Sequence, residues 1–190
     1  MSRSKLAWMV AIMMGFQSML FSTTAAWFPA LMVDRGIDPK IAGFYLMLNQ
    51  FAQVPMTFIF PVIAGKMKAQ RILVVIVSSF FLIGYSLLFT DYALMAMIFA
   101  GLGSGSAFSI CMLFCSLRAR TKEGSIALSG FGQSVGYLIA SIGPFMMGYL
   151  HDITDSWTSG IILLFVMVVI FMITGIYAGS NRVVEDEQLS

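Results

Sequence analysis

The sequence predicts an all-α membrane protein of six transmembrane helices, arranged as two inverted three-helix repeats. Three observations support this fold class. The 190 residues are 59% hydrophobic and only 11% charged, whereas ordinary soluble domains are about 25% charged. The charges separate six long uncharged runs, and a residue pattern of the second run recurs in the fifth. Because so few charges cannot cover a water-exposed surface, the lipid bilayer is the expected surrounding.

Each uncharged run is long enough to cross a bilayer. A helix rises about 1.5 Å per residue, so about 20 residues span a hydrocarbon core of about 30 Å. The six expected transmembrane helices lie at about 8–32, 41–65, 72–90, 92–116, 125–150 and 157–179. The breaks between them are too short to be domains. Residues 181–190 carry three acidic side chains and are expected to form a solvated cytoplasmic tail.

The distribution of Lys and Arg predicts the orientation. Of the 11 such residues, only Arg35 and Lys40 fall on one side of the expected helices. The others are Arg3, Lys5, Lys66, Lys68, Arg71, Arg118, Arg120, Lys122 and Arg182. Positive residues favour the cytoplasmic side. We therefore expect a multi-pass protein of the cell (inner or plasma) membrane with both termini in the cytoplasm.

A repeat with an offset of 83 residues relates the two halves of the chain. Its first copy holds Gln50, Pro61 and Gly65, and its second copy holds Gln133, Pro144 and Gly148. The same offset moves the first expected helix onto the fourth and the third onto the sixth. Because each unit has an odd number of helices, the two copies have opposite orientations in the membrane.

The repeated proline predicts a bend. Proline within a helix removes one backbone hydrogen bond and kinks the helix. Gly143 and Pro144 therefore predict a bend near the outer end of the fifth helix. The gating candidates are Pro61, Gly143, Pro144 and Gly148. A structural kink without movement is the alternative interpretation.

Several motifs resemble the second half of a major facilitator superfamily transporter. Segments within 6–29 (Leu-Ala-Trp, Gly-Phe-Gln-Ser and Trp-Phe-Pro) are similar to the seventh helix of that family, and 101–108 is similar to the tenth. The most specific stretch, 117–152, resembles the following loop and the eleventh helix. The closest branch is the cyanate/nitroimidazole one. The resemblance covers essentially the whole chain, but only helices seven to twelve of a twelve-helix transporter.

The resemblance implies one half of a secondary active transporter that moves a small solute by alternating access. The implied solute is a cyanate-like anion, a nitroimidazole or a related small compound. A second half is required, either as a homodimer or as a separate N-terminal six-helix half. The first and fourth helices would line the cavity, and the second and fifth would slide between halves. No enzyme activity, cofactor, metal or nucleic acid is implied.

Uncharged polar side chains are the candidates for substrate binding. Amides in lipid lack hydrogen-bond partners, so they should face protein or water. The candidates are Gln17, Trp27, Asn49, Gln50, Gln53, Ser104, Ser106, Gln133 and Tyr137. Interhelical hydrogen bonds are the alternative for the amides, close helix packing for the two serines, and an interface anchor for the tryptophan. Because no charged residue or histidine lies within the runs, any proton-coupling residue is expected in the other half.

Three other functions are open alternatives. A truncated, transport-inactive half-bundle would have the same sequence features. A permease subunit driven by a separate ATPase is disfavoured because the cytoplasmic loops are short. An intramembrane serine protease would use Ser104 or Ser106, but neither lies in the Gly-x-Ser-Gly motif that this chemistry uses.

Overall fold

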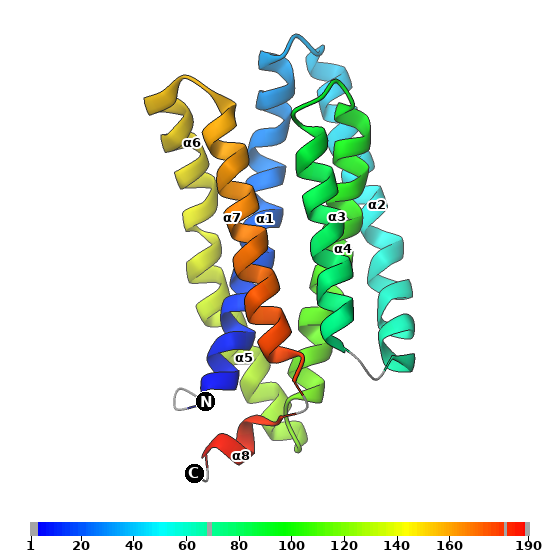
Figure 1. Ribbon diagram of the computed structural model, residues 1–190, viewed down its shortest axis with the longest axis vertical. Helices are drawn as coiled ribbons and strands as arrows, with labels where there is room; N and C mark the ends of the chain where they lie inside the picture. Colours follow the sequence, from blue (N-terminus) through cyan, green and yellow to red (C-terminus); the bar gives the residue numbers. More distant parts are fainter. Residues whose placement is uncertain (1–3, 68–69, 181, 189–190) are drawn as a thin grey trace.

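The computed structural model describes residues 4–67, 70–180 and 182–188, which form a bundle of long, roughly parallel and antiparallel helices (Figure 1). The helices are α1 (Lys5–Asp34), α2 (Pro39–Lys66), α3 (Gln70–Leu87), α4 (Ala93–Leu117), α5 (Lys122–Ala140), α6 (Ile142–Thr154), α7 (Trp157–Ala178) and α8 (Val184–Gln188). Arg3, Lys68 and part of the expected tail (181 and 189–190) lie outside the described residues.

Six segments are long and apolar enough to cross a membrane, as the sequence predicts. Five of them are single helices, and the fifth span, Lys122–Thr154, consists of α5 and α6 together. Side-chain caps set several helix starts, since the first backbone N–H groups of a helix lack partners within it. Ser4 accepts a hydrogen bond from the Ala7 amide, and Thr121 accepts one from the Gly124 amide.

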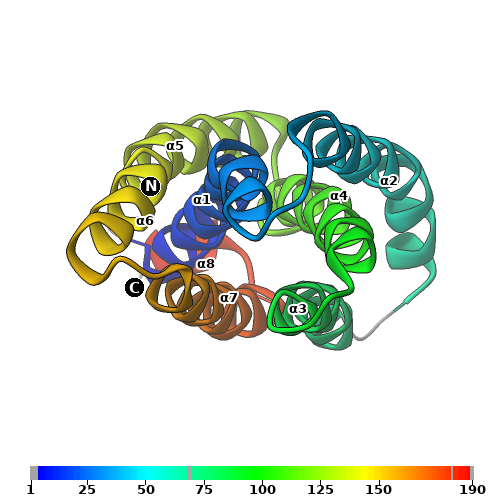
Figure 2. The same ribbon diagram turned by 90° about the horizontal axis from the view of Figure 1, so that it is seen from above.

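The helix contacts follow the repeat. α1 and α4 lie side by side in the middle of the bundle (Figure 2). α1 packs against α5 and α7, and α4 packs against α2 and α3. The offset of 83 residues moves α1 onto α4, α2 onto α5 and α6, and α3 onto α7. Each major contact of α1 with the second repeat therefore has an equivalent contact of α4 with the first repeat, and the expected pair of inverted three-helix units is confirmed.

The two sides of the bundle are buried differently. On the side of α3 and α7, aromatic rings pack into the core, with Phe81 between Tyr85 and Phe171 at centroid distances of 5.8 and 6.3 Å. α2 and α5 lie on the opposite side (Figure 2). They expose large apolar side chains there, including Phe58 and Leu138, each 73% exposed. The α2–α5 side thus presents an apolar face that this chain does not cover.

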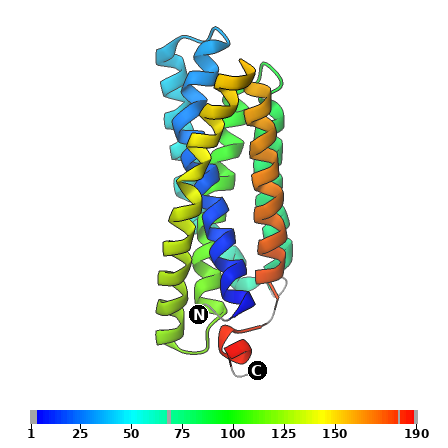
Figure 3. The same cartoon turned by 90° about the vertical axis from the view of Figure 1, so that its left-hand side faces the viewer.

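The fifth span is broken near its predicted bend. α5 ends at Ala140 and α6 begins at Ile142, and Figure 3 shows α6 continuing upward from α5 along one side of the bundle. A proline ring clashes with the carbonyl four residues earlier, which for Pro144 is Ala140. The predicted continuous helix over 125–150 is therefore interrupted at Ser141. α2 runs unbroken past Pro61, so the repeated proline has different effects in the two copies.

The expected solvated tail is instead docked on the bundle. The Val184 side chain is fully buried, and its amide donates to the Arg118 carbonyl oxygen at 2.9 Å. Glu185 Oε1 accepts from the Arg120 amide at 3.0 Å, and Asp186 lies 2.6 Å from the Arg120 guanidinium. At these three residues the structure differs from the expected solvated segment, because an apolar side chain and two carboxylates match the basic α4–α5 loop. The cytoplasmic placement of 181–190 stays a prediction.

Candidate functional site

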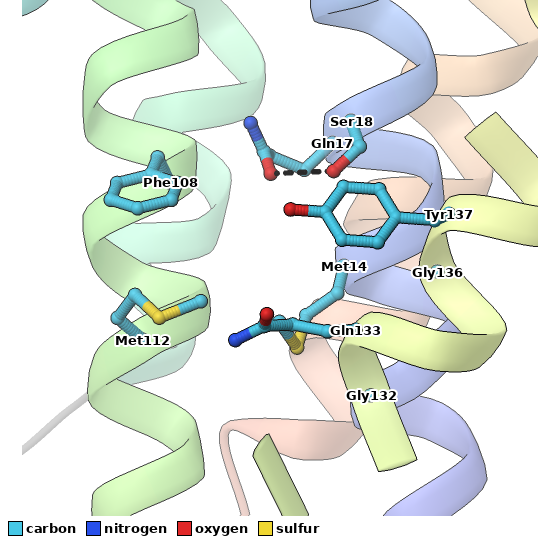
Figure 4. Close-up of a pocket in the computed structure, with 9 residues that line it drawn as sticks. All are labelled: Met14, Gln17, Ser18, Phe108, Met112, Gly132, Gln133, Gly136 and Tyr137. Atoms are coloured by element: carbon cyan, nitrogen blue, oxygen red, sulfur yellow. Dashed lines mark hydrogen bonds between the residues drawn. The ribbon is translucent and has the colours of Figure 1, made fainter. Parts of the chain in front are cut away.

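Two adjoining chambers lie between the helix pairs α1–α5 and α2–α4. The smaller has a volume of about 170 Å³ and the larger about 620 Å³. The smaller chamber is lined by Met14, Gln17, Ser18, Phe108, Met112, Gly132, Gln133, Gly136 and Tyr137 (Figure 4). The larger chamber is lined by Gln17, Ser18, Phe21, Ser22, Gln50, Gln53, Val54, Thr57, Phe108, Tyr137 and Ala140. Four residues line both chambers, so the two form one continuous site.

Glycines fix the helix pairs on both sides of this site. A Cβ atom at Gly105 of α4 would overlap the Gln53 carbonyl oxygen of α2. On the other pair, a Cβ atom at Gly136 of α5 would lie 3.3 Å from the Gly15 amide nitrogen of α1. Small residues let helix backbones approach closely in membranes. The open space therefore lies between two tight helix pairs rather than within either pair.

The wall formed by α1 and α5 is polar. Gln17 is 7% exposed, and its Oε1 accepts from Ser18 Oγ at 3.3 Å. Gln133 Nε2 donates to Ser129 Oγ at 3.2 Å. Tyr137 is 65% exposed. Figure 4 shows the side chains of Gln17, Gln133 and Tyr137 extending toward α4, so amide and hydroxyl groups converge on one space.

The wall formed by α4 is apolar, and α2 adds further amides. Phe108 and Met112 of α4 face the polar wall across the smaller chamber (Figure 4). In the larger chamber, Gln53 Nε2 donates to Gln50 Oε1 at 2.8 Å. None of the described residues that line the two chambers is charged. The site can therefore form neutral hydrogen bonds and apolar contacts, without a fixed counter-charge.

Five of the nine substrate-binding candidates line the chambers, and four lie elsewhere. Asn49 is buried between α2 and α4, where its Nδ2 donates to the Met97 carbonyl oxygen at 2.8 Å. Ser104 and Ser106 are also buried, and Ser106 Oγ donates to the Leu102 carbonyl oxygen of its own helix. These three side chains are buried within the helix packing, and the bonds of Asn49 and Ser106 are to backbone carbonyl oxygens.

Trp27 lies away from the chambers, against α6. Its Nε1 donates to the Pro144 carbonyl oxygen at 2.8 Å, and a Cβ atom at Gly148 would lie 2.6 Å from its ring. Pro144 and Gly148, two of the gating candidates, thus both contact Trp27. In contrast, Gly65, the repeat equivalent of Gly148, has no atom within 4 Å of a Cβ built on it.

The same end of the bundle holds a second aromatic contact. Trp157 Nε1 donates to Asp34 Oδ2 at 2.9 Å, and the His151 ring lies 4.1 Å from the Trp157 ring. His151 is the single histidine of the sequence. It lies at the end of α6, and Ser104 and Ser106 are buried in α4, so the described structure does not assemble a serine–histidine pair.

Sequence reasoning missed the apolar lining of the site. Met14, Phe108 and Met112 are indistinguishable by type from the many other methionines and phenylalanines of the chain. Ser18 and Ser22, the polar neighbours of Gln17 in the site, were visible in the sequence as part of a polar cluster on the first helix. A signal for Phe108 is its position directly after the small-residue stretch 103–107, where a large side chain interrupts a close-packing surface.

Comparisons with known proteins place this geometry in a family. The model of the major facilitator superfamily matches residues 1–144. The chain is 43% identical over 94% of its length to an uncharacterized transporter, YycB, of Bacillus subtilis (strain 168), covering 46% of that protein. It is 31% identical over 95% of its length to the 2-nitroimidazole transporter of Escherichia coli (strain K12), again covering 46% of it.

A third relative is the cyanate transport protein CynX of Escherichia coli (strain K12), 23% identical over 80% of this chain and 40% of that protein. The chain thus spans about half the length of the curated relatives it matches. No solved structure matches the chain significantly. The expected relationship, including the cyanate/nitroimidazole branch, is confirmed, and the chain belongs to the major facilitator superfamily.

Proposed function

We propose that this chain forms one half of a secondary active transporter and carries a small solute through the two-chambered site by alternating access. The observation that carries the proposal is a cavity of uncharged polar side chains between helices long enough to span a membrane. Transporter sites of this kind lie near the bilayer midplane, at the interface of repeats. The function is transport rather than a chemical reaction.

The exposed apolar face on α2 and α5 supports the need for a second six-helix unit. Phe51, Phe58 and Leu138 are each at least 64% exposed there. The larger chamber is lined by Gln50, Gln53 and Thr57 of α2 together with residues of α1, α4 and α5. A second unit on this face would close the site, and the partner is a second copy or a separate N-terminal half.

The names of the relatives support a small solute. Relatives of this chain include a 2-nitroimidazole transporter and a cyanate transport protein. The amide and hydroxyl donors of the chambers can hydrogen-bond both the polar 2-nitroimidazole ring and the small cyanate anion. We propose the same solute class for this chain: a cyanate-like anion, a nitroimidazole or a related small compound.

We also propose that both termini face the cytoplasm of a cell carrying this protein in its inner or plasma membrane. The two described ends of the chain lie at the same end of the bundle (Figure 1). That end also carries Lys66, Arg118 and Arg120 at the ends of α2 and α4. Positive residues at one end favour its cytoplasmic placement.

Uptake into liposomes tests the function. The chain is reconstituted alone and together with the N-terminal half of the Bacillus subtilis relative, and uptake of labelled 2-nitroimidazole and cyanate is measured. Uptake of either solute above that of empty liposomes, abolished when Gln17→Ala and Gln133→Ala are combined, supports the proposal. Native mass spectrometry of the same samples identifies a homodimer or a paired half.

Absence of uptake in both samples, with intact helical bundles by circular dichroism, would instead identify a transport-inactive half-bundle. The matched control is Ser79→Ala. Ser79 lies on α3 and is not among the residues that line the two chambers, and its hydroxyl bonds only to its own helix, at the Ile76 carbonyl oxygen.

A further inference from the structure

The smaller chamber has the volume of a single ring. Its volume is about 170 Å³, and an apolar cavity of about 150 Å³ holds one benzene ring. The larger chamber, at about 620 Å³, falls in the range of pockets that bind drug-sized molecules. The two chambers therefore differ in what they can enclose, and the smaller is the selective one.

The walls of the smaller chamber suit an aromatic ring. Met14 of α1 and Met112 of α4 lie on different sides of the space (Figure 4). Methionine sulfur makes favourable contacts with aromatic rings, and the flexible side chain adapts to the shape of its partner. Gly132 and Gly136 of α5 also line the chamber, and their missing side chains let α1 approach: a Cβ atom at Gly132 would lie 2.6 Å from the Met14 sulfur. The Met14 sulfur is therefore held against the backbone of α5 beside the chamber.

Of the polar side chains that line the smaller chamber, the Gln133 amide is the one that extends beside the methionines. Gln133 extends into the space near both methionines (Figure 4). A glutamine amide has two N–H donors and a carbonyl acceptor, and one donor of Gln133 is used on Ser129 Oγ. One donor and the acceptor are left for a solute. The amide therefore suits a ring that carries both a hydrogen-bond donor and an acceptor on one edge.

Two aromatic side chains stand where the chambers join. Phe108 and Tyr137 line both chambers, and the Tyr137 side chain extends across the site toward α4, where the Phe108 ring lies (Figure 4). Phe108 is 45% exposed and Tyr137 is 65% exposed, so both have accessible ring surface. A planar ring can pass between them and stack, whereas a bulky three-dimensional solute meets a narrower passage.

We propose that the smaller chamber is a specificity subsite for one five- or six-membered aromatic ring, held between Met14 and Met112, bound on its polar edge by Gln133, and entered between Phe108 and Tyr137. This inference rests on the proposed transport function and assigns ring selection to this end of the site. Solutes without a ring occupy the larger chamber.

Methionine methyl NMR tests the subsite directly. The full chain is labelled with ¹³C at the methionine methyl groups and placed in lipid nanodiscs, and 2-nitroimidazole is titrated in. A bound ring should shift the Met14 and Met112 signals, which are assigned with Met14→Leu and Met112→Leu. The Met95 signal should stay in place, because Met95 is exposed on the outer surface of α4. Cyanate, which has no ring, should leave both cavity signals unshifted.

Affinity gives the second readout. Met112→Phe replaces the flexible thioether by a rigid ring in the wall of the smaller chamber and should raise the Kd for 2-nitroimidazole at least tenfold, with little change for cyanate. Met95→Phe makes the same change on the same helix outside the site and should leave both values at those of the wild type. Gln133→Leu, which removes the amide with little change in volume, should also raise the Kd for 2-nitroimidazole.

The outcomes separate the subsite from the transport function. Saturable 2-nitroimidazole binding that leaves Met14 and Met112 unshifted, with equal Kd values for Met112→Phe and Met95→Phe, overturns the ring subsite and leaves the larger chamber as the solute site. Absence of binding for both 2-nitroimidazole and cyanate overturns the subsite and the proposed function together. If Met112→Phe does not fold, Gln133→Leu and the methyl shifts decide the question.

Discussion

Gly105 lies where α4 meets the backbone of α2, so Gly105→Ala should destabilise this helix pair. The added Cβ would overlap the Gln53 carbonyl oxygen and lie 3.0 Å from the Gln53 carbonyl carbon and Cα. Both obstacles are backbone atoms, so no side-chain rotation relieves the overlap and the two helices must separate. Overpacking of this kind costs about 1–3 kcal/mol, and a backbone obstacle favours the upper half of that range.

Gly130→Ala is the matched control for this prediction. Gly130 is also within a helix, but a Cβ atom built on it has no neighbour within 4 Å. Replacing glycine by alanine inside a helix is favourable by about 1 kcal/mol, and this gain applies to both variants. The difference between them therefore isolates the packing cost at Gly105, which we expect to be about 2–3 kcal/mol.

The buried cysteines provide the assay. Cys111 and Cys115 are free thiols on α4, exposed by 1% and 4%. A thiol-reactive fluorogenic dye reports their exposure as the purified chain is heated in detergent. Gly105→Ala should unfold about 5–10 °C below Gly130→Ala, since about 1 kcal/mol corresponds to about 2–4 °C for a chain of this size. Equal unfolding temperatures would refute the inference that this backbone contact holds α2 against α4.

Three further predictions concern the site, the α6 contact and the tail. Gln17→Ala and Gln133→Ala should each lower solute affinity about 3–10-fold in the reconstituted assembly, because one hydrogen bond contributes about 0.5–1.5 kcal/mol; wild-type Kd values in both variants would remove these residues from the site. Gly148→Ala places a methyl group 2.6 Å from the Trp27 ring, so the indole should lose its hydrogen bond to the Pro144 carbonyl oxygen of α6. Tryptophan emission should then shift to longer wavelength, and an unchanged spectrum would count against the contact. Val184→Asp removes a fully buried apolar side chain, whose burial contributes about 1.5–3 kcal/mol, so proteolysis of the C-terminal segment should accelerate at least tenfold. An unchanged cleavage rate would show that the segment is not docked on the bundle.

The sequence was sufficient to predict the transmembrane helices and their order, because the bilayer imposes one strong rule on long uncharged runs. Every span must satisfy its own backbone, so an apolar run of about 20 residues can only be a helix. The bend near Pro144 was predicted, but not that the helix breaks at Ser141 while α2 stays continuous, because Pro61 and Pro144 have the same sequence signature. Proline disturbs the carbonyl four residues earlier, and whether the helix breaks there depends on neighbours that only the folded bundle supplies.

The sequence predicted amide side chains in the candidate site, but not which of the predicted amides lie outside it. Gln17 and Gln133 had to face protein or water, and they face the chambers. Asn49 obeys the same rule by bonding to the Met97 carbonyl oxygen of a neighbouring helix. Composition cannot separate these two outcomes, because both satisfy a buried amide equally well. The docked tail was missed for a related reason: Val184 is one apolar residue in a charged segment, and its burial depends on the facing loop.

The repeat explains how a symmetric fold makes an asymmetric site. Subtracting the offset of 83 residues from the packing glycines Gly101 and Gly105 of α4 gives Ser18 and Ser22 of α1. These two serines line the larger chamber. In the α1–α5 pair, which is equivalent to the α4–α2 pair, the helices instead approach closely at Gly136 of α5.

The α4–α2 pair approaches closely at glycines of α4, whereas the α1–α5 pair has a glycine on each partner, Gly15 and Gly136. α1 presents hydroxyl and amide groups to the site, whereas α4 presents Phe108 and Met112 at the positions of Ala25 and Pro29. A polar wall and an apolar wall therefore face each other across the pseudo-symmetry axis. This arrangement grips a flat polar ring on its edge and on its face, which neither wall could do with a copy of itself.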